Sequence, residues 1–318
     1  MCKNKEAYRQ LCQSEADIPV FLQPWWLDVV CERGNWEVCL TFDKGGEITG
    51  ALPIFRTRFR GFQVIRMPLL TPFLGAWLKY PPTLEKPSRR YAFEHRVLNE
   101  LIRQLPRVAY FTQNFHYGMT NWLPFYWQGF RQTTFYSYVI ENISNSESVF
   151  KNFEGDIRTE IRKAEKNLTF RTGDDFELFW KLNQLAFKNK GLPMPYSKAF
   201  FRKVDDALKA RDKRRIYFAE DEFQNVHAAI YLLLDNTTTF YLASGRNEAL
   251  DEGGAVSFLI WEALKDLSGT VQAFDFEGSI IPGIENFFRS FGGVQKPYFQ
   301  IYKGKNRFFD LLKLLVEK

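Results

Sequence analysis

The spacing of apolar residues predicts a series of short helices rather than one long repeat. The clearest amphipathic helix follows Gly253 and Gly254. Its apolar positions recur at intervals of three and four residues: Val256, Leu259, Ile260, Ala263, Leu264 and Leu267. The same periodicity predicts helices over residues 90–105, 157–166, 176–188 and 197–210. No run of about 18 apolar residues occurs, so no helix is expected to span a membrane.

Runs rich in β-branched and aromatic residues, bounded by turn residues, predict the strands. In the first half they cover residues 36–42 and 48–55, after a helix that begins at Pro24, and residues 121–138 are expected to be strand-rich. In the second half they cover residues 215–220, 228–234 and 238–244. The short connections between these three predict an antiparallel meander. Strands at 271–276 and 298–302, a helix at 282–290 and a last helix after Lys305 complete the prediction.

The order of these elements predicts two domains of mixed type. Helix, hairpin and helix occur in the first part of the chain, and a similar order returns after the polar stretch 141–146. A length of 318 residues also suits two domains. We therefore expect an α/β fold with partly antiparallel, mixed sheets, divided into residues 1–141 and 142–304.

Composition narrows the class of protein. Hydrophobic residues make up 45% and aromatic residues 17% of the chain, which predicts a large globular core. No apolar segment follows the first residues, so a cytoplasmic location is expected. The four cysteines lie in the first 40 residues without a CxxC pair, and the three histidines are far apart. Neither a disulfide framework nor a metal site is expected.

Several segments resemble the FemAB-like acetyltransferase group of the GNAT superfamily. Residues 274–278 read Phe-Asp-Phe-Glu-Gly, and residues 291–293 read Phe-Gly-Gly, which is similar to the C-terminal signature of that group. The basic stretch Arg158–Lys166 resembles its helix at the start of the second domain. Gly191-Leu192-Pro193 and Pro24-Trp25-Trp26 resemble a loop and an N-terminal entry of the same group.

The resemblance implies tandem GNAT-like domains, with the active cleft in or near the second domain. It also implies that the final helix, residues 305–318, packs back on the first domain. Members of the group transfer acyl groups from acyl-CoA, or amino acids from aminoacyl-tRNA to cell-wall precursors. In standard GNAT enzymes an Arg or Gln precedes the glycine-rich donor loop, whereas Leu250 stands at that position here. This departure leaves the acyl donor open.

Gly253, Gly254 and Ala255 are the candidate residues for binding the cofactor. They open a helix, where free backbone N–H groups and the helix dipole favour a phosphate. A tight turn would require the same glycines. Arg246, at the end of the preceding strand, is a further candidate for a phosphate contact.

Asp275 and Glu277 are the candidate catalytic carboxylates. Side chains along a strand repeat every two residues, so both are expected on one face, alternating with Phe274 and Phe276. A carboxylate at a strand end can accept the proton of an attacking amine, and Glu277 is favoured as this base. Both could instead cap the following loop. Tyr298 is the candidate acid for the leaving group, with a core position as the alternative.

Arg158, Arg162 and Lys166 recur every four residues and are expected to form a basic row on one helix. The row could bind phosphates of the acceptor or of a tRNA end, or it could be a solvated face, since Glu160 and Glu165 lie on the same helix. A net charge of +6 and a pI near 9.0 suit an anionic partner.

The sequence is compatible with three functions. The first is an N-acyltransferase that moves an acyl group from acyl-CoA to an amine acceptor, either a small molecule or a peptide precursor. The second is an aminoacyl-tRNA-dependent peptidyltransferase. The third is a degenerate GNAT-like module that binds a ligand without catalysis. DNA is not an expected partner, and the basic residues leave a peripheral contact with an anionic membrane open.

Overall fold

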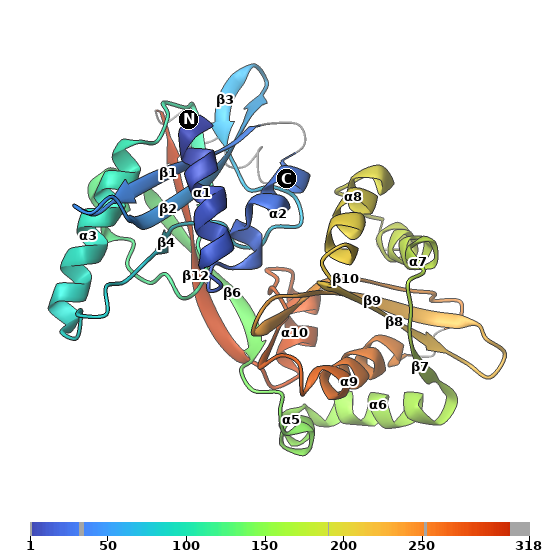
Figure 1. Ribbon diagram of the computed structural model, residues 1–318. Helices are drawn as coiled ribbons and strands as arrows, with labels where there is room; N and C mark the ends of the chain where they lie inside the picture. The colour runs from blue at the N-terminus through green and yellow to red at the C-terminus, as the bar shows by residue number, and fades with distance from the viewer. Residues whose placement is uncertain (1, 32–34, 190, 251–252, 306–318) are drawn as a thin grey trace. The chain divides into compact units, whose positions relative to one another are not determined.

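The chain folds into two compact units in a computed structural model that describes residues 2–31, 35–189, 191–250 and 253–305 (Figure 1). The first unit is Met1–Phe135 together with Pro297–Lys318, and the second is Tyr136–Lys296. The sequence-based division lay a few residues later and kept residues 142–304 together, whereas in the structure the chain returns to the first unit at Pro297. The predicted final helix lies outside the described residues.

The first unit contains a sheet flanked by helices. Its helices are α1 (Cys2–Ser14), the 3-10 helix η1 (Val20–Leu22), α2 (Pro24–Val30), α3 (Pro87–Arg103) and α4 (Leu123–Trp127). Its strands are β1 (Asn35–Phe42), β2 (Ile48–Phe59), β3 (Phe62–Ile65), β4 (Trp77–Leu78) and β5 (Tyr110–Asn114). The sheet order is β1-β2-β3-β5, followed by the end of β12 (Val294–Gly304), and β4 pairs with β2.

The second unit contains a mixed sheet with helices on both faces. Its helices are α5 (Ser146–Asn152), α6 (Gly155–Asn167), α7 (Phe176–Asn189), α8 (Lys198–Lys209), α9 (Ala255–Leu267) and α10 (Pro282–Arg289). Its strands are β6 (Arg131–Ile140), β7 (Thr169–Thr172), β8 (Arg214–Glu220), β9 (Val226–Leu234), β10 (Thr238–Arg246) and β11 (Ala273–Asp275). The order is β6-β11-β10-β9-β8-β7, and of these pairs only β10 with β11 is parallel. The predicted meander of β8, β9 and β10 is confirmed.

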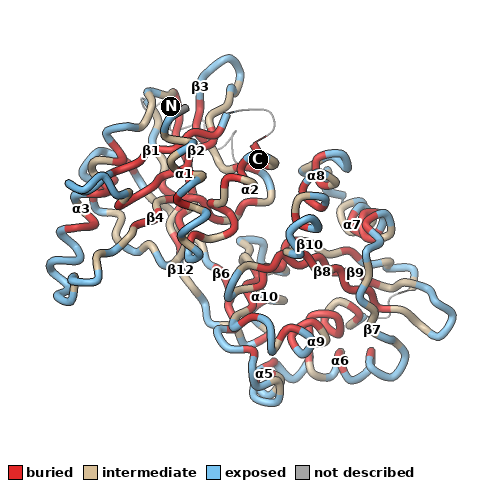
Figure 2. The backbone as a smooth tube through the Cα atoms, in the orientation of Figure 1, coloured by how far each residue is buried: buried red, intermediate tan, exposed pale blue. Residues whose placement is uncertain are grey.

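Helices cover both faces of the second sheet. On one face the buried residues Tyr217, Ile230 and Leu232 share a core with α6 and α9. On the other face Tyr231, one residue along from Ile230, contacts Phe179 of α7 and Phe201 of α8. This alternation is the period-two pattern of a strand buried on both sides. Figure 2 shows these strands and α9 as buried segments.

Two parts of the fold differ from the prediction. Residues 121–138 are not all strand, because Pro124 stands in the first turn of the short helix α4 and β6 begins only at Arg131. The strand expected at 271–276 is reduced to Ala273–Asp275. Its end matters for the site, because the residues that follow it leave the sheet in a tight turn.

Gly245 sets how closely α7 approaches the sheet. A Cβ atom at this position would lie 2.2 Å from the carbonyl carbon of Leu182 and 2.3 Å from the backbone nitrogen of Asn183. The α7 backbone therefore crosses β10 in direct contact. This contact places Asn183 against the end of β10.

Candidate functional site

The candidate site lies where the parallel strands β10 and β11 separate. The two strands pair over three residues, Thr238–Phe240 with Ala273–Asp275. Strand β11 then ends, while β10 continues to Arg246 after a register shift between Tyr241 and Ala243. Ligands in α/β proteins bind beyond the carboxyl ends of parallel strands, and bulges are frequent beside active sites. Asp275 and Glu277 occupy this end of β11.

Asp275 is fully buried and holds the turn after its strand. Its Oδ1 atom accepts a hydrogen bond from the Ser137 hydroxyl on the neighbouring β6 and another, of 2.8 Å, from the backbone N–H of Glu277. Asp275 therefore caps the loop that follows its strand, which is the alternative role that the sequence left open for the two carboxylates. The side chain orients the next acidic residue.

Glu277 combines three unusual features. Its φ angle is +60°, a left-handed conformation that costs a non-glycine residue about 1–2 kcal/mol. Its Oε1 atom is enclosed and makes no hydrogen bond to the described residues. Burial first, and then the charge of Asp275, raise the pKa of Glu277 well above its usual value. Strain and a strongly shifted pKa in one residue are typical of functional positions.

Gly278 makes the turn beyond Glu277 possible. Its φ angle is +73°, and a Cβ atom there would lie 1.9 Å from the carbonyl oxygen of Tyr136. No side chain can be accommodated at this position. The close approach of the chain to β6 therefore fixes the backbone that follows Glu277.

Tyr196 and Asn183 belong to the same neighbourhood, although the sequence did not single them out. The Tyr196 hydroxyl donates to Asn183 Oδ1 at 3.2 Å, and Asn183 Nδ2 donates to the carbonyl oxygen of Ser244 at 2.7 Å. Burial raises the pKa of Tyr196, and the charge of Glu277 adds to the rise. The sequence did contain a signal for Asn183, because it is a polar residue at an apolar position of the helix predicted over residues 176–188. In the structure its side chain is buried, with 1% exposure.

Tyr298 belongs to a different environment from the two carboxylates. It lies in the part of β12 that belongs to the first unit and is buried. Its ring packs against Phe73 at 5.0 Å and Phe135 at 5.8 Å between centroids. These contacts are those of a core aromatic residue, and the acid role of Tyr298 stays a prediction.

The predicted cofactor loop leads into α9, but a carboxylate of the protein lies at its first turn. Gly254 is the left-handed N-cap of α9, and a Cβ atom there would lie 2.9 Å from the carbonyl oxygen of Glu160 on α6. The Ser257 hydroxyl donates to Glu160 Oε2 at 2.9 Å. An acidic side chain at a helix N-terminus is stabilised by the same dipole that would attract a phosphate.

The other residues around this loop do not complete a phosphate-binding site. Arg246 forms an ion pair with Glu248 at 3.0 Å, and Leu250 offers no polar side chain. Gly253 has a positive φ angle, as the tight-turn alternative requires. The described residues at this end of α9 therefore do not fit the diphosphate of a coenzyme A. Ala255 begins the helix itself.

The basic row of α6 is only partly brought together. Arg158 and Arg162 line a surface pocket between α5, α6 and α9, and Lys151 of α5 joins them. Lys166, near the end of the helix, is exposed and does not line this pocket. Within the part of the chain that the structure describes, neither arginine forms an ion pair with a carboxylate.

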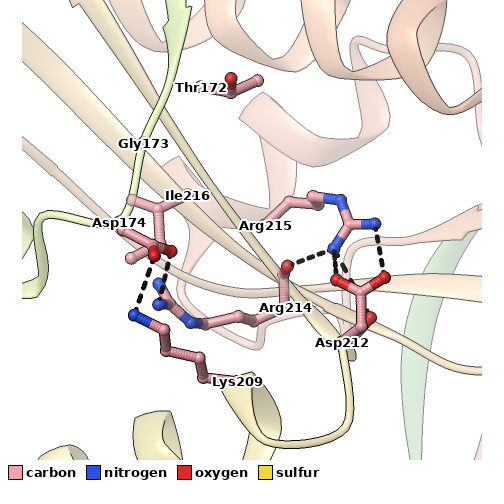
Figure 3. A pocket seen from close by; sticks show the side chains of 8 residues that line it. All are labelled: Thr172, Gly173, Asp174, Lys209, Asp212, Arg214, Arg215 and Ile216. Carbon is pink, nitrogen blue, oxygen red and sulfur yellow. Dashed lines mark hydrogen bonds and ion pairs between the residues drawn. The ribbon is translucent and has the colours of Figure 1, made fainter.

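A second pocket, of about 300 Å³, is lined by three basic residues, and each of them forms an ion pair with an aspartate (Figure 3). Asp174 pairs with Lys209 at 2.8 Å and with Arg214 at 2.7 Å. Asp212 pairs with Arg215 at 2.7 Å. Figure 3 shows that the charged groups point at one another rather than at a common centre. This pocket has no cation left for an anionic ligand, so we do not assign it a function.

Neither thiol chemistry nor a metal cluster emerges from the described residues. Cys12, Cys31 and Cys39 are free, and burial raises the pKa of Cys39 to about 12. Such thiols are protonated at neutral pH and are poor nucleophiles. No group of three or more His, Cys, Asp or Glu side chains in the described ranges could hold a metal ion. In the same ranges no helix is long and apolar enough to cross a membrane.

The comparisons with known proteins agree with this architecture. The family model of the acetyltransferase (GNAT) domain matches residues 151–289. The crystal structure of FemX superimposes with a TM-score of 0.67 at 10% identity and covers 98% of each chain. The C-terminal domain of a putative lysylphosphatidylglycerol synthetase from Agrobacterium fabrum gives a TM-score of 0.57 at 10% identity, covering 99% of this chain and 95% of that one.

A third similar structure is L-PGS from Bacillus licheniformis, with a TM-score of 0.53 at 11% identity, covering 99% of this chain and 95% of that one. No curated protein sequence matches. At such low identities the structures establish the fold alone. They confirm the predicted mixed α/β fold and the resemblance to the FemAB-like group. The chain therefore has the fold of FemX, and its residues 151–289 match the acetyltransferase (GNAT) domain model.

Proposed function

We propose that this protein transfers an acyl group from an activated ester to an amine acceptor, with Glu277 as the group that moves the proton. The observation that supports this most is the Glu277 carboxyl group itself, which is strained, enclosed and shifted in pKa at the end of β11. The GNAT domain match over residues 151–289 includes this position. Acyl transfer is the chemistry of that domain class.

The proposed reaction needs one proton to move from nitrogen to oxygen. The neutral amine attacks the carbonyl carbon of the ester, a C–N bond forms, and the C–O bond to the leaving alcohol breaks. The ionised Glu277 carboxylate accepts the proton that the nitrogen loses. It then donates that proton to the leaving oxygen, so that the residue returns to its starting form. A group with a raised pKa suits both steps better than an ordinary carboxylate.

The remaining residues of the site would position this carboxyl group. Asp275 accepts a hydrogen bond from the backbone N–H of Glu277, and the charge of Asp275 contributes to the raised pKa of Glu277. Asn183 and Tyr196 connect α7 and the loop before α8 to the end of β10. Besides burial, the charge of Glu277 contributes to the raised pKa of Tyr196, so the two side chains belong to one neighbourhood. We expect them to orient the acceptor or the carboxyl group rather than to exchange protons.

The environment of α9 supports an ester donor over acyl-CoA. Glu160 accepts a hydrogen bond from Ser257 in the first turn of α9, and Gly254 packs against the backbone of Glu160. A diphosphate at this helix end would meet a carboxylate instead of free N–H groups. Of the donors that the FemAB resemblance implies, aminoacyl-tRNA carries its acyl group as an ester and needs no diphosphate contact here. We therefore favour the peptidyltransferase hypothesis.

A donor comparison tests this proposal. The protein is incubated with radiolabelled aminoacyl-tRNA or acetyl-CoA and a panel of amine acceptors, including nucleotide-linked peptide precursors, and amide products are separated chromatographically. We expect label transfer from aminoacyl-tRNA and none from acetyl-CoA. Transfer from acetyl-CoA alone would contradict the donor assignment but not the role of Glu277. No transfer from either donor to any acceptor would favour a binding module.

A further inference from the structure

A pocket lies between α5, α6 and α9, apart from the site around Glu277. Its volume is about 380 Å³, in the lower part of the roughly 300–1,000 Å³ range of small-molecule sites. The lining residues are Ser146, Glu147, Phe150, Lys151, Arg158, Arg162 and Trp261. Three cations and one carboxylate make the pocket basic, and two aromatic rings make one wall apolar.

The cations of this pocket are available, unlike those of the pocket in Figure 3. Arg158 donates one hydrogen bond, of 2.8 Å, to the carbonyl oxygen of Lys151, which holds its guanidinium beside α5. The described residues include no carboxylate within ion-pair distance of Lys151, Arg158 or Arg162. In the pocket of Figure 3, by contrast, Lys209, Arg214 and Arg215 all pair with aspartates.

The arrangement of the arginines is unfavourable without an anion. Arg158 and Arg162 lie one turn apart on α6, where like charges destabilise a helix by about 0.2–0.5 kcal/mol. An anion between the guanidinium groups would reverse this repulsion. Arginine suits a phosphate in particular, because its planar N–H groups can bind two oxygens at once.

The aromatic wall adds a requirement on the rest of the ligand. Phe150 is half-buried and packs against Trp261 with ring centroids 4.8 Å apart. The Arg162 guanidinium lies 5.7 Å from the centre of the Phe150 ring. Free inorganic phosphate would leave this apolar surface in water. A phosphate carried on an aromatic or hydrocarbon group would cover it.

The pocket and Glu277 lie on opposite faces of the sheet. Trp261 and Phe150 pack with the core that contains Phe274 and Phe276. Asp275 and Glu277 alternate with these two phenylalanines along the chain. Besides burial, the charge of Glu277 raises the pKa of Tyr196, whose ring packs against Phe201 of α8 on the other side of the sheet. A ligand in this pocket is therefore separate from the reacting groups.

We propose that the pocket between α5, α6 and α9 binds a phosphate ester attached to an aromatic or hydrocarbon group, through Arg158, Arg162 and Lys151. The phosphate contacts the cations, and the attached group lies on Phe150 and Trp261. The ligand can be a free organic phosphate or the headgroup region of an anionic phospholipid, since both present this chemistry. The site does not depend on the activity proposed for Glu277.

Calorimetric titration of the full chain tests the site. The probes are phenyl phosphate and inorganic phosphate, together with vesicles of phosphatidylglycerol or phosphatidylcholine in a sedimentation assay. We expect phenyl phosphate or the phosphatidylglycerol vesicles to bind, and phenyl phosphate to bind at least tenfold more tightly than inorganic phosphate if the free ester is the ligand. The double variant Arg158→Gln, Arg162→Gln should weaken that binding at least tenfold.

A matched double variant separates the pocket from general charge. Lys163→Gln with Lys181→Gln removes the same charge from exposed positions of α6 and α7 that do not line the pocket. It should bind the ligand within about twofold of the wild type, because exposed charges contribute little without a specific contact. Equal losses in the two double variants would overturn the site. So would a wild-type protein that binds neither phenyl phosphate nor the phosphatidylglycerol vesicles.

Discussion

Glu277 carries an energetic cost that packing alone does not explain. A left-handed φ angle and an enclosed, unsatisfied carboxyl oxygen both destabilise the folded state. The surrounding structure maintains both, through the Asp275 hydrogen bond on one side and the contact of Gly278 with Tyr136 on the other. Such a combination is expected where the chemistry requires a carboxyl group with a raised pKa.

The raised pKa predicts how stability depends on pH. The folded protein keeps the Glu277 proton in a pH range where the unfolded chain has lost it, above the ordinary value of 4.5. The free energy of unfolding therefore falls as the pH rises from about 4.5 to the raised pKa, by about 1.4 kcal/mol for each pH unit in this interval. Glu277→Gln removes this contribution. The stability of the variant relative to the wild type should increase as the pH rises above about 4.5, as measured by thermal or urea unfolding at a series of pH values.

The control for this prediction is Glu248→Gln, which changes an exposed glutamate of the same unit. Its stability difference from the wild type should stay nearly constant over the same pH range. If Glu277→Gln behaves in the same way, the Glu277 carboxyl group is not in the buried environment described for it.

Asp275 should control the pKa of its neighbour. Asp275→Asn removes the charge that adds to the rise, while burial, the larger cause, remains. We expect the pH at which Glu277 ionises to move down without reaching its ordinary value. The midpoint of the pH-dependent stability difference reports it. The variant should also lose about 1–3 kcal/mol of stability, because its hydrogen bonds no longer involve a charge. An unchanged midpoint would contradict the coupling between the two residues.

At the scale of elements, the contact between α7 and β10 positions the polar network of the site. Gly245→Ala would place a methyl group 2.2 Å from the backbone of Leu182, so the helix must move. Such overpacking costs about 1–3 kcal/mol. We expect a lower melting temperature and a weakened Asn183–Ser244 hydrogen bond. Gly283→Ala is the matched control, since it lies in α10 with open space around it and should be neutral or slightly stabilising.

The interaction between α6 and α9 gives a further prediction. Glu160→Ala removes the carboxylate at the first turn of α9 and should cost about 0.3–1 kcal/mol, a typical value for a charge at a helix end. The wild type should show no increase in melting temperature with coenzyme A. A ligand at 100 times its Kd would add about 2.7 kcal/mol, so binding would be visible. A clear shift with coenzyme A would contradict the assignment of this helix end.

The sequence predicted most elements of the second unit because their patterns are local. The apolar spacing after Gly254 predicted α9, and the periodicity over residues 197–210 predicted α8. In the structure Ser197 is the N-cap of α8 and accepts a hydrogen bond from the Phe200 N–H at 3.2 Å. The short helix α4 was missed, because aromatic residues suit strands as well as helices. The proximity of Asp275 to Ser137 could not be predicted, since these residues are 138 positions apart and meet only through strand pairing.

At the scale of the whole molecule, the two proposed sites belong to one unit. The residues around Glu277 and the pocket of Arg158 and Arg162 all lie in Tyr136–Lys296. Tyr298, the predicted acid, lies in the other unit, in the part of the chain that begins at Pro297. The net charge of +6 suits an anionic donor or acceptor, but it is the unpaired cations on α5 and α6 that give this charge a specific location.

Proton transfer by Glu277 is tested by the rate of amide formation across pH for the wild type and Glu277→Gln, with a donor and acceptor that the wild type uses. The wild-type rate should rise with pH through the raised pKa of Glu277. The variant should be slower by about 10²–10⁴-fold, the usual contribution of a general base, and should lack that rise while remaining folded. A folded Glu277→Gln protein with the turnover and pH profile of the wild type would contradict the role of Glu277 as the general base.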